Sequence, residues 1–154
     1  MNRSKINPTI RVQRLEHAGD LQLPSYESRD AAGMDIRAAL REPIILEPGA
    51  RELIPTGFRM AIPAGYEIQV RPRSGLAWKQ GLTMLNSPGT IDADYRGEIK
   101  LLAVNHGQNP ITIRHGDRVA QIVLAPVIQA RLEESESLDD TTRGESGFGS
   151  TGIG

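Results

Sequence analysis

The chain has 154 residues, a length that bounds it to one domain or to one domain with a tail. Its net charge of −1 gives no general attraction for nucleic acid or for an anionic membrane, so a bound anion must be held by local groups. Cysteine is absent, which excludes disulfides and thiolate metal sites, and neither a signal-peptide pattern nor an apolar stretch of about 18 residues occurs. We therefore expect a soluble protein of the cytoplasm.

The composition predicts many short strands. Sixteen glycines and ten prolines are spread along the chain, which fits turns between strands and argues against long helices. Only one Trp, three Tyr and two Phe are present, so the core must be built from Val, Ile, Leu, Met and Ala.

The first part of the chain predicts strands around one carboxylate. Apolar and polar residues alternate over 9–15, and the polar stretch 16–31 reads as a loop. In 32–39, Asp35 lies among strand-forming neighbours, so its carboxylate is expected to be partly buried and to need a cation or hydrogen-bond donors. A salt bridge or a turn cap is the simpler interpretation, and ligand binding is the alternative.

Residues 43–70 are expected to be scaffold. Each Pro or Gly cluster is followed by four to six strand-forming residues, which predicts short antiparallel strands that follow one another in sequence. Phe58 and Tyr66 are predicted to lie in the core or next to it.

Residues 71–82 predict a short helix and an anion site. Ser74 is suited to cap the helix and Gly81 to end it. Arg73 stands directly before free N–H groups at the helix start, an arrangement that suits phosphate oxygens. A capped surface helix with solvated arginines is the alternative.

The stretch 86–100 predicts a β-hairpin, because turn formers precede Thr90 and Ile91 and an apolar alternation resumes after Gly97. Its tip carries two carboxylates, a phenol and a guanidinium, on Asp92, Asp94, Tyr95 and Arg96. Such a turn favours a pocket built largely from backbone, with a carboxylate placed to move a proton. A solvated, charged turn is the alternative, and the stretch taken alone favours neither; its position directly after 71–82 favours phosphate binding at that helix.

Farther along, 111–113 predicts a short strand between turns, and 119–125 predicts a buried strand interrupted by Gln121. The Gln121 amide must be satisfied by a neighbouring backbone or by a ligand. The three histidines lack metal-ligand spacing and are expected to be structural or solvent-exposed: His17, His106 and His115.

From residue 131 the composition turns acidic and polar, so this segment cannot pack on its own. A G-x-G-x-x-G pattern at 147–152 is no dinucleotide fingerprint, because no strand precedes it and no helix follows it. We expect a flexible lid over a bound triphosphate, with Arg143 and Ser150 holding phosphates and Phe148 covering a base.

With this tail, the chain resembles the trimeric all-β dUTP diphosphatases. Five motifs of that family occur in order: A-G-M-D-I at 32–36, P-R-S-G-L-A at 72–77, G-T-I-D-A-D-Y-R-G at 89–97, G-D-R-V-A-Q at 116–121 and R-G-E-S-G-F-G-S-T-G at 143–152. Each motif alone is a weak pattern, but a chance match of all five in the order of the family is very improbable. The pattern does not account for Trp78.

The resemblance implies an all-β, jelly-roll-like barrel of short antiparallel strands with one short helix, over residues 1–130, and a flexible arm over 131–154. It also implies homotrimers whose active sites lie between subunits, the arm of one chain closing over a site built by others. An isolated chain should then be inactive.

The activity implied is hydrolysis of dUTP to dUMP and pyrophosphate, which keeps uracil out of DNA and supplies dUMP for thymidylate synthesis. Asp92 would be the general base that activates a water for in-line attack on the α-phosphorus. Mg²⁺ would be held by the triphosphate and by waters, with Asp35 at most an outer-sphere partner. Phosphates would be held by Arg73, Ser74, Gly75, Gln121, Arg143, Gly149 and Ser150.

The resemblance also implies how the substrate is selected. Uracil would be read by the Asn86 side chain and by backbone groups near Thr90, Ile91 and Lys100, and Phe148 would cover it. Tyr95 would stack on the deoxyribose and leave no room for a 2′-hydroxyl.

Two alternatives stay open. One is a dCTP deaminase, or a bifunctional deaminase and diphosphatase, on the same fold. The other is a non-catalytic nucleotide-binding regulatory protein, against which the intact Asp92 and the complete arm argue. The expected partners are dUTP and further copies of the chain, with no nucleic acid and no membrane.

Overall fold

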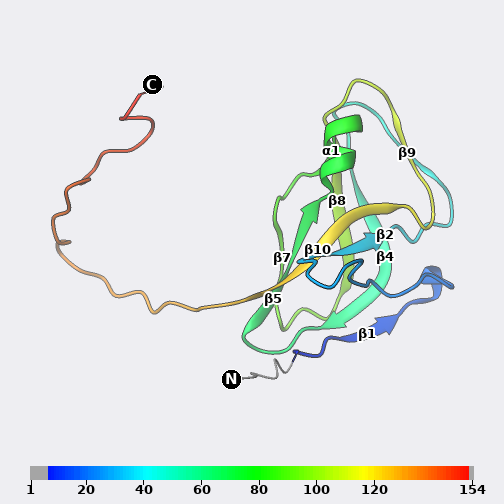
Figure 1. Cartoon of the computed structure of the whole chain (residues 1–154), viewed down its shortest axis with the longest axis horizontal. Helices are drawn as coiled ribbons and strands as arrows, with labels where there is room; N and C mark the ends of the chain where they lie inside the picture. The colour runs from blue at the N-terminus through cyan, green and yellow to red at the C-terminus, as the bar shows by residue number, and fades with distance from the viewer. Residues whose placement is uncertain (1–6, 153–154) are drawn as a thin grey trace.

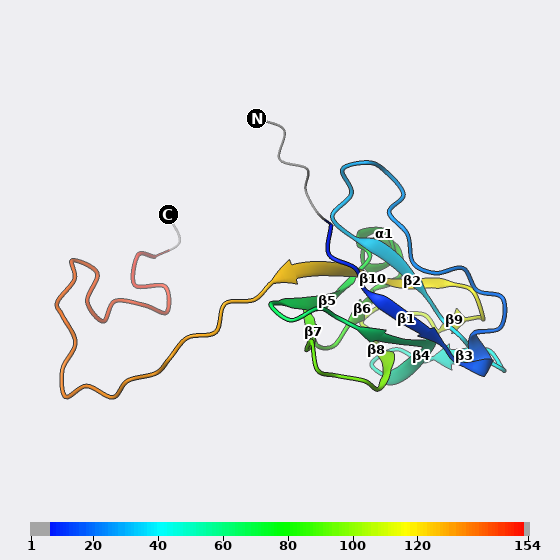
Figure 2. The same ribbon diagram turned by 90° about the horizontal axis from the view of Figure 1, so that it is seen from below.

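The computed structural model of the chain describes residues 7–152. In that range the chain forms ten strands, one short 3-10 helix, η1 (Glu16–Ala18), and one α-helix, α1 (Ser74–Gln80). The strands wrap into a barrel with α1 at one end, and the segment after the last strand runs away from the barrel (Figures 1 and 2).

Two four-stranded sheets and one strand pair make up the barrel, and every pairing is antiparallel. The first sheet has the order β1 (Arg11–Arg14), β4 (Arg51–Ala61), β8 (Glu98–Asn105) and β6 (Leu82–Met84). The second has the order β2 (Met34–Arg37), β10 (Arg118–Pro126), β5 (Tyr66–Pro72) and β7 (Gly89–Ile91). The separate pair is β3 (Ile44–Leu46) with β9 (Ile111–Ile113). The all-β, jelly-roll-like architecture is thus confirmed.

The core lies between the two sheets and is aliphatic, as the composition predicts. Alternate residues of β8 and β10 point into it, including Leu101 and Ile122, which are fully buried. Phe58 is the one buried aromatic among the described residues, and the half-buried Tyr66 packs against the core, so both placements are confirmed. Because few bulky aromatics are available, many aliphatic side chains share this burial.

The predicted strand boundaries between 43 and 70 are wrong in one respect. β4 runs for 11 residues straight through Pro55 and Gly57, and its partners are β1 and β8 rather than its neighbours in sequence. The register with β8 shifts between Pro55 and Arg59, where three residues of β4 face one residue of β8. This bulge accommodates a proline and a glycine with φ of +73° inside a continuous strand.

The predicted hairpin over 86–100 is also wrong in its pairing. Strands do form at β7 and β8, but β7 pairs with β5 while β8 pairs with β4 and β6, so the two belong to different sheets. The six residues between them therefore cross from one sheet to the other.

Helix α1 ends as predicted but begins differently. Gly81 adopts a left-handed conformation, with φ of 74°, and its N–H bonds to Ala77, which is the expected C-terminal cap. The N-cap position is held by Arg73, without a side-chain cap, so the predicted cap by Ser74 is wrong and its hydroxyl stays exposed. Trp78 on this helix is 89% exposed.

The segment 127–152 contains neither strand nor helix, and its apolar side chains at Leu132, Leu138 and Phe148 lie in solvent. The acidic composition gives it no apolar face to pack on the barrel. Within residues 7–152, no helix combines the length and the apolar character that crossing a membrane requires.

Candidate active site

Five of the predicted substrate-binding residues line one cavity of about 330 Å³, here called the base pocket. They come from β7, from β8 and from the crossing between them: Thr90, Ile91, Asp92, Tyr95 and Lys100. Three neighbours complete the lining: Leu53, Glu98 and Ile99.

The base pocket exists because β7 and β8 separate. β7 is the last strand in its sheet, so the N–H and C=O groups on its outer side have no strand partner within residues 7–152. On β8, β6 pairs only with residues 103–105, and Lys100 faces Pro55, which has no N–H to offer. Unpaired main-chain groups therefore border the pocket from both strands.

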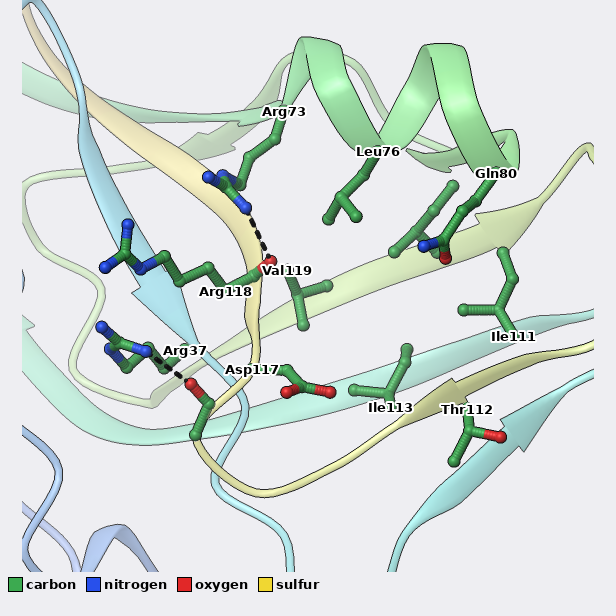
Figure 3. A pocket seen from close by; sticks show the side chains of 12 residues that line it. Arg37, Arg73, Leu76, Gln80, Ile111, Thr112, Ile113, Asp117, Arg118 and Val119 are labelled. Atoms are coloured by element: carbon green, nitrogen blue, oxygen red, sulfur yellow. Dashed lines mark hydrogen bonds between the residues drawn. The ribbon is translucent and has the colours of Figure 1, made fainter.

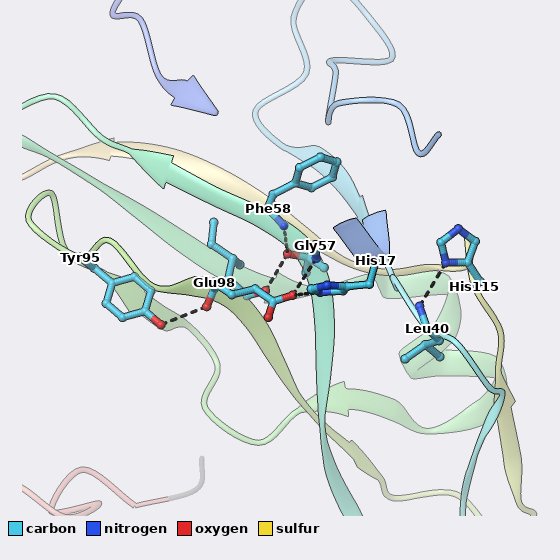
Figure 4. Close-up of polar contacts among 9 residues, drawn as sticks. His17, Leu40, Gly57, Phe58, Tyr95, Glu98 and His115 are labelled. Atoms are coloured by element: carbon cyan, nitrogen blue, oxygen red, sulfur yellow. Dashed lines mark hydrogen bonds and ion pairs between the residues drawn. The ribbon is translucent and has the colours of Figure 1, made fainter. Parts of the chain in front are cut away.

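Tyr95 has a fixed place in this pocket. Its hydroxyl donates to the main-chain oxygen of Glu98 at 3.0 Å (Figure 4). The ring lies so close to Gly97 that a Cβ there would stand 2.3 Å from the hydroxyl oxygen. Glycine is thus required beneath the ring.

Asp92 lies where two hollows meet. It lines the base pocket and also a larger hollow of about 670 Å³ beside Tyr66 and Glu67. Its main-chain oxygen accepts from the Tyr95 N–H at 3.1 Å, which closes the turn and leaves the carboxylate exposed. A group in this place can reach a water or a ligand from either side.

Asn86 does not line the base pocket. It lies exposed in the bend before β7, with its amide nitrogen over Gly89, where a Cβ would come within 3.0 Å. Its predicted contact with a base stays a prediction.

A second cavity, of about 500 Å³, has a wall of three arginines over an apolar floor and is here called the arginine hollow (Figure 3). Arg37 donates to the Gly116 oxygen at 2.7 Å, and Arg73 donates to the Arg118 oxygen at 3.3 Å. These main-chain bonds hold the guanidinium groups in place while most of their donors stay free.

Asp35 joins this cluster from β2. Its carboxylate lies 3.0 Å from Nε of Arg73 and 3.5 Å from Nη1 of Arg118, and its side chain is 21% exposed. The expected salt bridge of a partly buried carboxylate is therefore confirmed, and its partners come from the second and fourth motifs.

Gln121 lies between these elements in the sheet. On β10 it faces Asp35 of β2 on one side and Arg71 of β5 on the other, and its amide nitrogen donates to the Pro72 oxygen at 3.0 Å. The backbone alternative is thus confirmed for the amide nitrogen, and binding of a ligand by Gln121 stays a prediction. A Cβ at Gly33 would meet the Gln121 oxygen at 2.6 Å, which explains the glycine of the first motif.

The other two predicted phosphate-binding residues of the second motif lie directly after Arg73. Ser74 and Gly75 form the first turn of α1 and are exposed, and a Cβ added at Gly75 would meet nothing within 4 Å.

The arm residues stay apart from both cavities. Arg143 bonds locally to the Ser146 oxygen at 2.9 Å, Ser150 lies in the turns that follow, and Phe148 is fully exposed. The base pocket and the arginine hollow share no lining residue. The segment that follows β10 runs away from the barrel (Figure 1), so its residues line neither cavity.

The three histidines are structural or exposed, as predicted. His17 contacts the Glu98 carboxylate, His115 accepts from the Leu40 N–H at 3.1 Å, and His106 is exposed. Within residues 7–152, no three His, Asp or Glu side chains gather in a way that would hold a metal ion.

Sequence reasoning missed three residues that line the two cavities: Arg37, Arg118 and Glu98. Arg37 had a usable signal, because it follows Asp35 by two positions in a strand and therefore shares its face. Arg118 and Glu98 depend on contacts between segments far apart in the sequence, which no local pattern reveals.

Comparison with known proteins agrees with this arrangement. The dUTPase family profile matches residues 20–152. The deoxyuridine 5′-triphosphate nucleotidohydrolase of Rhizobium rhizogenes is 55% identical over 148 residues, 95% of both chains. That of Beijerinckia indica is 58% identical over 149 residues, 96% of this chain and 93% of the relative.

Solved structures give the same result. The dUTPase of Staphylococcus bacteriophage 80alpha with dUpNHpp superposes with a TM-score of 0.84 at 28% identity, over 94% of this chain and 99% of that one. An Asp-to-Asn mutant of the dUTPase from phage phi11 of S. aureus, described with a structural Mg(II) ion, gives 0.75 at 26% identity, over 84% and 97%. These matches place the chain among the hydrolases of nucleotide metabolism. The chain belongs to the dUTPase family.

Proposed function

We propose that this protein hydrolyses dUTP to dUMP and pyrophosphate, and so limits uracil in DNA while supplying dUMP. One observation carries the proposal most directly. In a member of the dUTPase family, five of the residues assigned to base, sugar and attacking water line one cavity, with an exposed carboxylate at Asp92.

Uracil would be read in the base pocket by main-chain groups. The outer edge of β7 at Thr90 and Ile91 and the unpaired part of β8 near Lys100 offer donors and acceptors at fixed positions. The Asn86 side chain would add to them from the bend before β7. Cytosine presents the opposite pattern at the same edge, and a buried mismatch of this kind discriminates by roughly 10⁴-fold.

The sugar would be selected by Tyr95. Its ring lies on Gly97 and its hydroxyl is bonded to Glu98, so the ring cannot retreat from a ligand without breaking that bond. A ring stacked on the deoxyribose leaves no space for a 2′-hydroxyl, which would exclude UTP.

Asp92 would act as the general base. Its carboxylate accepts a proton from a water as the water oxygen attacks the α-phosphorus in line, the bond to the bridging oxygen breaks, and pyrophosphate leaves. Proton transfer of this kind contributes typically about 10² to 10⁴-fold. The rest of the acceleration must come from positioning and neutralising the triphosphate.

The triphosphate would be held by the groups around the arginine hollow. Arg73 supplies guanidinium donors oriented by Asp35, Ser74 and Gly75 offer a hydroxyl and exposed N–H groups, and Gln121 lies alongside. From the arm, Arg143, Gly149 and Ser150 would complete the cradle, and Phe148 would cover the base.

Mg²⁺ would support this chemistry by neutralising charge on the triphosphate. Within residues 7–152 the chain gathers no cage of three or more ligands, and Asp35 is already paired with two arginines. The residues thus fit an ion that arrives with the triphosphate and its waters, with Asp35 as an outer-sphere contact.

We further propose a homotrimer with active sites between subunits. The proposal is supported by the lack of a shared lining residue between base pocket and arginine hollow and by the exposure of the arm residues, which further copies of the chain would bring together. In this arrangement 1–130 would be the barrel domain and 131–154 a flexible arm that closes over a site built by other copies; the ends of both, 1–6 and 153–154, lie outside the described residues.

The test is pyrophosphate release from dUTP, dCTP, dTTP and UTP, with Mg²⁺ and again with a chelator, beside an ammonia assay on dCTP. We expect release from dUTP alone, weakened by chelation, and no ammonia. Ammonia from dCTP would instead identify a deaminase. Binding of dUTP without turnover of any of the four would identify a regulatory nucleotide-binding protein.

A further inference from the structure

Glu98 is a charged residue in an unusual position. It begins β8 and lines the base pocket, yet its side chain is only 14% exposed. One carboxylate oxygen accepts from the Gly57 N–H at 2.9 Å and also from Nε2 of His17 (Figure 4). A carboxylate this far from water needs such donors.

The β4 bulge explains why Glu98 is held there. Where three residues of β4 face one residue of β8, the Gly57 N–H has no ladder partner on β8, and the Glu98 side chain takes that place. The neighbouring Thr56 hydroxyl bonds to the Ile99 oxygen at 2.6 Å. The start of β8 is therefore fixed to β4 by two side chains in addition to the pairing of Glu98 with Arg59, because the ladder is irregular at the bulge.

The same residue holds Tyr95 through its main chain. The Glu98 carbonyl accepts the Tyr95 hydroxyl at 3.0 Å, and Gly97 lies under the ring. His17, 81 positions earlier in η1, is thus connected through Glu98 to the Tyr95 ring.

We propose that Glu98 is a positioning residue for sugar selection, anchored by His17 and by the Gly57 N–H, and that it acts by fixing the carbonyl that holds Tyr95. This inference rests on the proposed function, in which Tyr95 stacks on the deoxyribose. When the Glu98 side chain is released, the carbonyl shifts, the ring gains freedom and a ribose fits. We expect kcat/KM to rise for UTP. For dUTP, which fits either position of the ring, kcat/KM should change less.

The experiment compares kcat/KM for dUTP and for UTP in the assembled protein. In Glu98→Ala we expect the dUTP over UTP ratio to fall about tenfold, within the roughly 10²-fold that a small misplacement of a binding group costs. Glu98→Gln keeps an oxygen that accepts from the Gly57 N–H, so its dUTP over UTP ratio should stay closer to that of the native protein. Glu52→Ala, which removes an exposed glutamate of β4, is the matched control and should leave the ratio unchanged.

A second variant keeps the test independent of folding. His17→Ala removes one anchor and leaves the Gly57 bond in place, so a smaller fall of the same ratio is expected. Urea unfolding of each variant accompanies the kinetics. A loss of stability alone lowers kcat/KM for dUTP and for UTP by the same factor and leaves the ratio of the two unchanged.

A double-mutant cycle tests the route of the effect. If Glu98 acts through the Tyr95 hydroxyl, Glu98→Ala changes the ratio in the native background and changes it little in a Tyr95→Phe background. If the two substitutions changed the dUTP over UTP ratio additively, the proposed route would be overturned. A Glu98→Ala variant with a higher KM for dUTP and an unchanged ratio would overturn it as well.

The outcome separates two failures. Absence of dUTP hydrolysis by the native protein would overturn the proposed function itself. A native protein selective for dUTP, whose ratio narrows in Tyr95→Ala but not in the Glu98 or His17 variants, would overturn the positioning role alone.

Discussion

At the scale of single residues, the placement of Asp92 separates it from the other acids. Most carboxylates of the barrel are solvated or paired, as Asp35 is with Arg73 and Arg118. Asp92 is exposed at the meeting of two hollows, beside a ring that is held in place. A proton acceptor needs this kind of access.

The first prediction follows from that placement. Asp92→Asn should still bind dUTP but lose turnover by about several hundred-fold, because an amide cannot take the proton of the attacking water. Single-turnover pyrophosphate release and dUTP titration measure the two properties. Glu52→Gln, at an exposed carboxylate away from the cavities, is the control, and near-native turnover of Asp92→Asn would remove Asp92 from the role.

Gly97 gives a second prediction at this scale. In Gly97→Ala the new methyl would stand 2.3 Å from the Tyr95 hydroxyl oxygen and 2.5 Å from its ring carbon, so the ring must move. We expect a narrower preference for dUTP over UTP with the fold retained. A native ratio in a well-folded variant would show that the ring position does not set sugar selection.

At the scale of elements, the bounds of a strand differ from those that its local sequence predicts where contacts with distant residues stabilise the strand. Pro55 and Gly57 read as strand ends, yet β4 passes through them because Thr56 and Glu98 bond the groups that the bulge leaves unpaired. The apolar alternation of β8 was predictable, because burial of one face imposes the period directly, and so was the buried strand β10, because both of its faces carry apolar residues.

The same reasoning explains how much of the candidate site the sequence could supply. The five residues of the base pocket that were predicted lie close together in the chain, so a local motif identified them together: Thr90, Ile91, Asp92, Tyr95 and Lys100. The same motif did not reveal that their strands pair with β4 and β5 rather than with each other. The Asp35 carboxylate meets Arg118 from 83 positions away, and the strand order of the sheet makes that contact. Proximity of this kind follows from topology.

The β4 bulge carries the third prediction. Thr56 is fully buried, and its hydroxyl donates to the Ile99 oxygen at 2.6 Å. Thr56→Val keeps the shape but leaves that carbonyl without its donor, which should lower the free energy of unfolding by about 1–3 kcal/mol. Urea unfolding measures the loss, and Thr112→Val, at an exposed position of β9, should cost far less. Equal losses would show that the bulge does not depend on this hydroxyl.

At the scale of the whole molecule, the chain divides by charge. Residues 1–130 contain 16 Lys and Arg against 13 Asp and Glu, whereas 131–154 contain 2 against 6. The arm thus carries the excess of negative charge and the glycine-rich motif together, and it extends from the end of β10 without packing on its own barrel (Figure 2).

The fourth prediction concerns this arm. Deleting 141–154 should spare folding and assembly, because residues 141–152 pack on nothing in the barrel, and should abolish efficient dUTP hydrolysis, because the arm carries the fifth motif. Circular dichroism, sedimentation and pyrophosphate release measure these properties. Full activity of the shortened chain would make the arm dispensable.

Mixing two inactive variants tests whether the arm acts between copies. Asp92→Asn chains keep the arm, and shortened chains keep Asp92, so trimers refolded from both contain complete sites only if an arm serves another copy. Recovery of activity is expected, and its absence would place each arm over its own barrel.

Trp78 has a practical consequence. It is the single tryptophan of the chain, it is 89% exposed, and it stands on α1, the helix whose first turn carries Ser74 and Gly75. The intrinsic fluorescence of the protein therefore reports on one place. A lone chain should emit at the long wavelength of an indole in water, and any copy or ligand that covers this helix will shift the emission toward the blue, which makes the molecule its own optical probe of assembly.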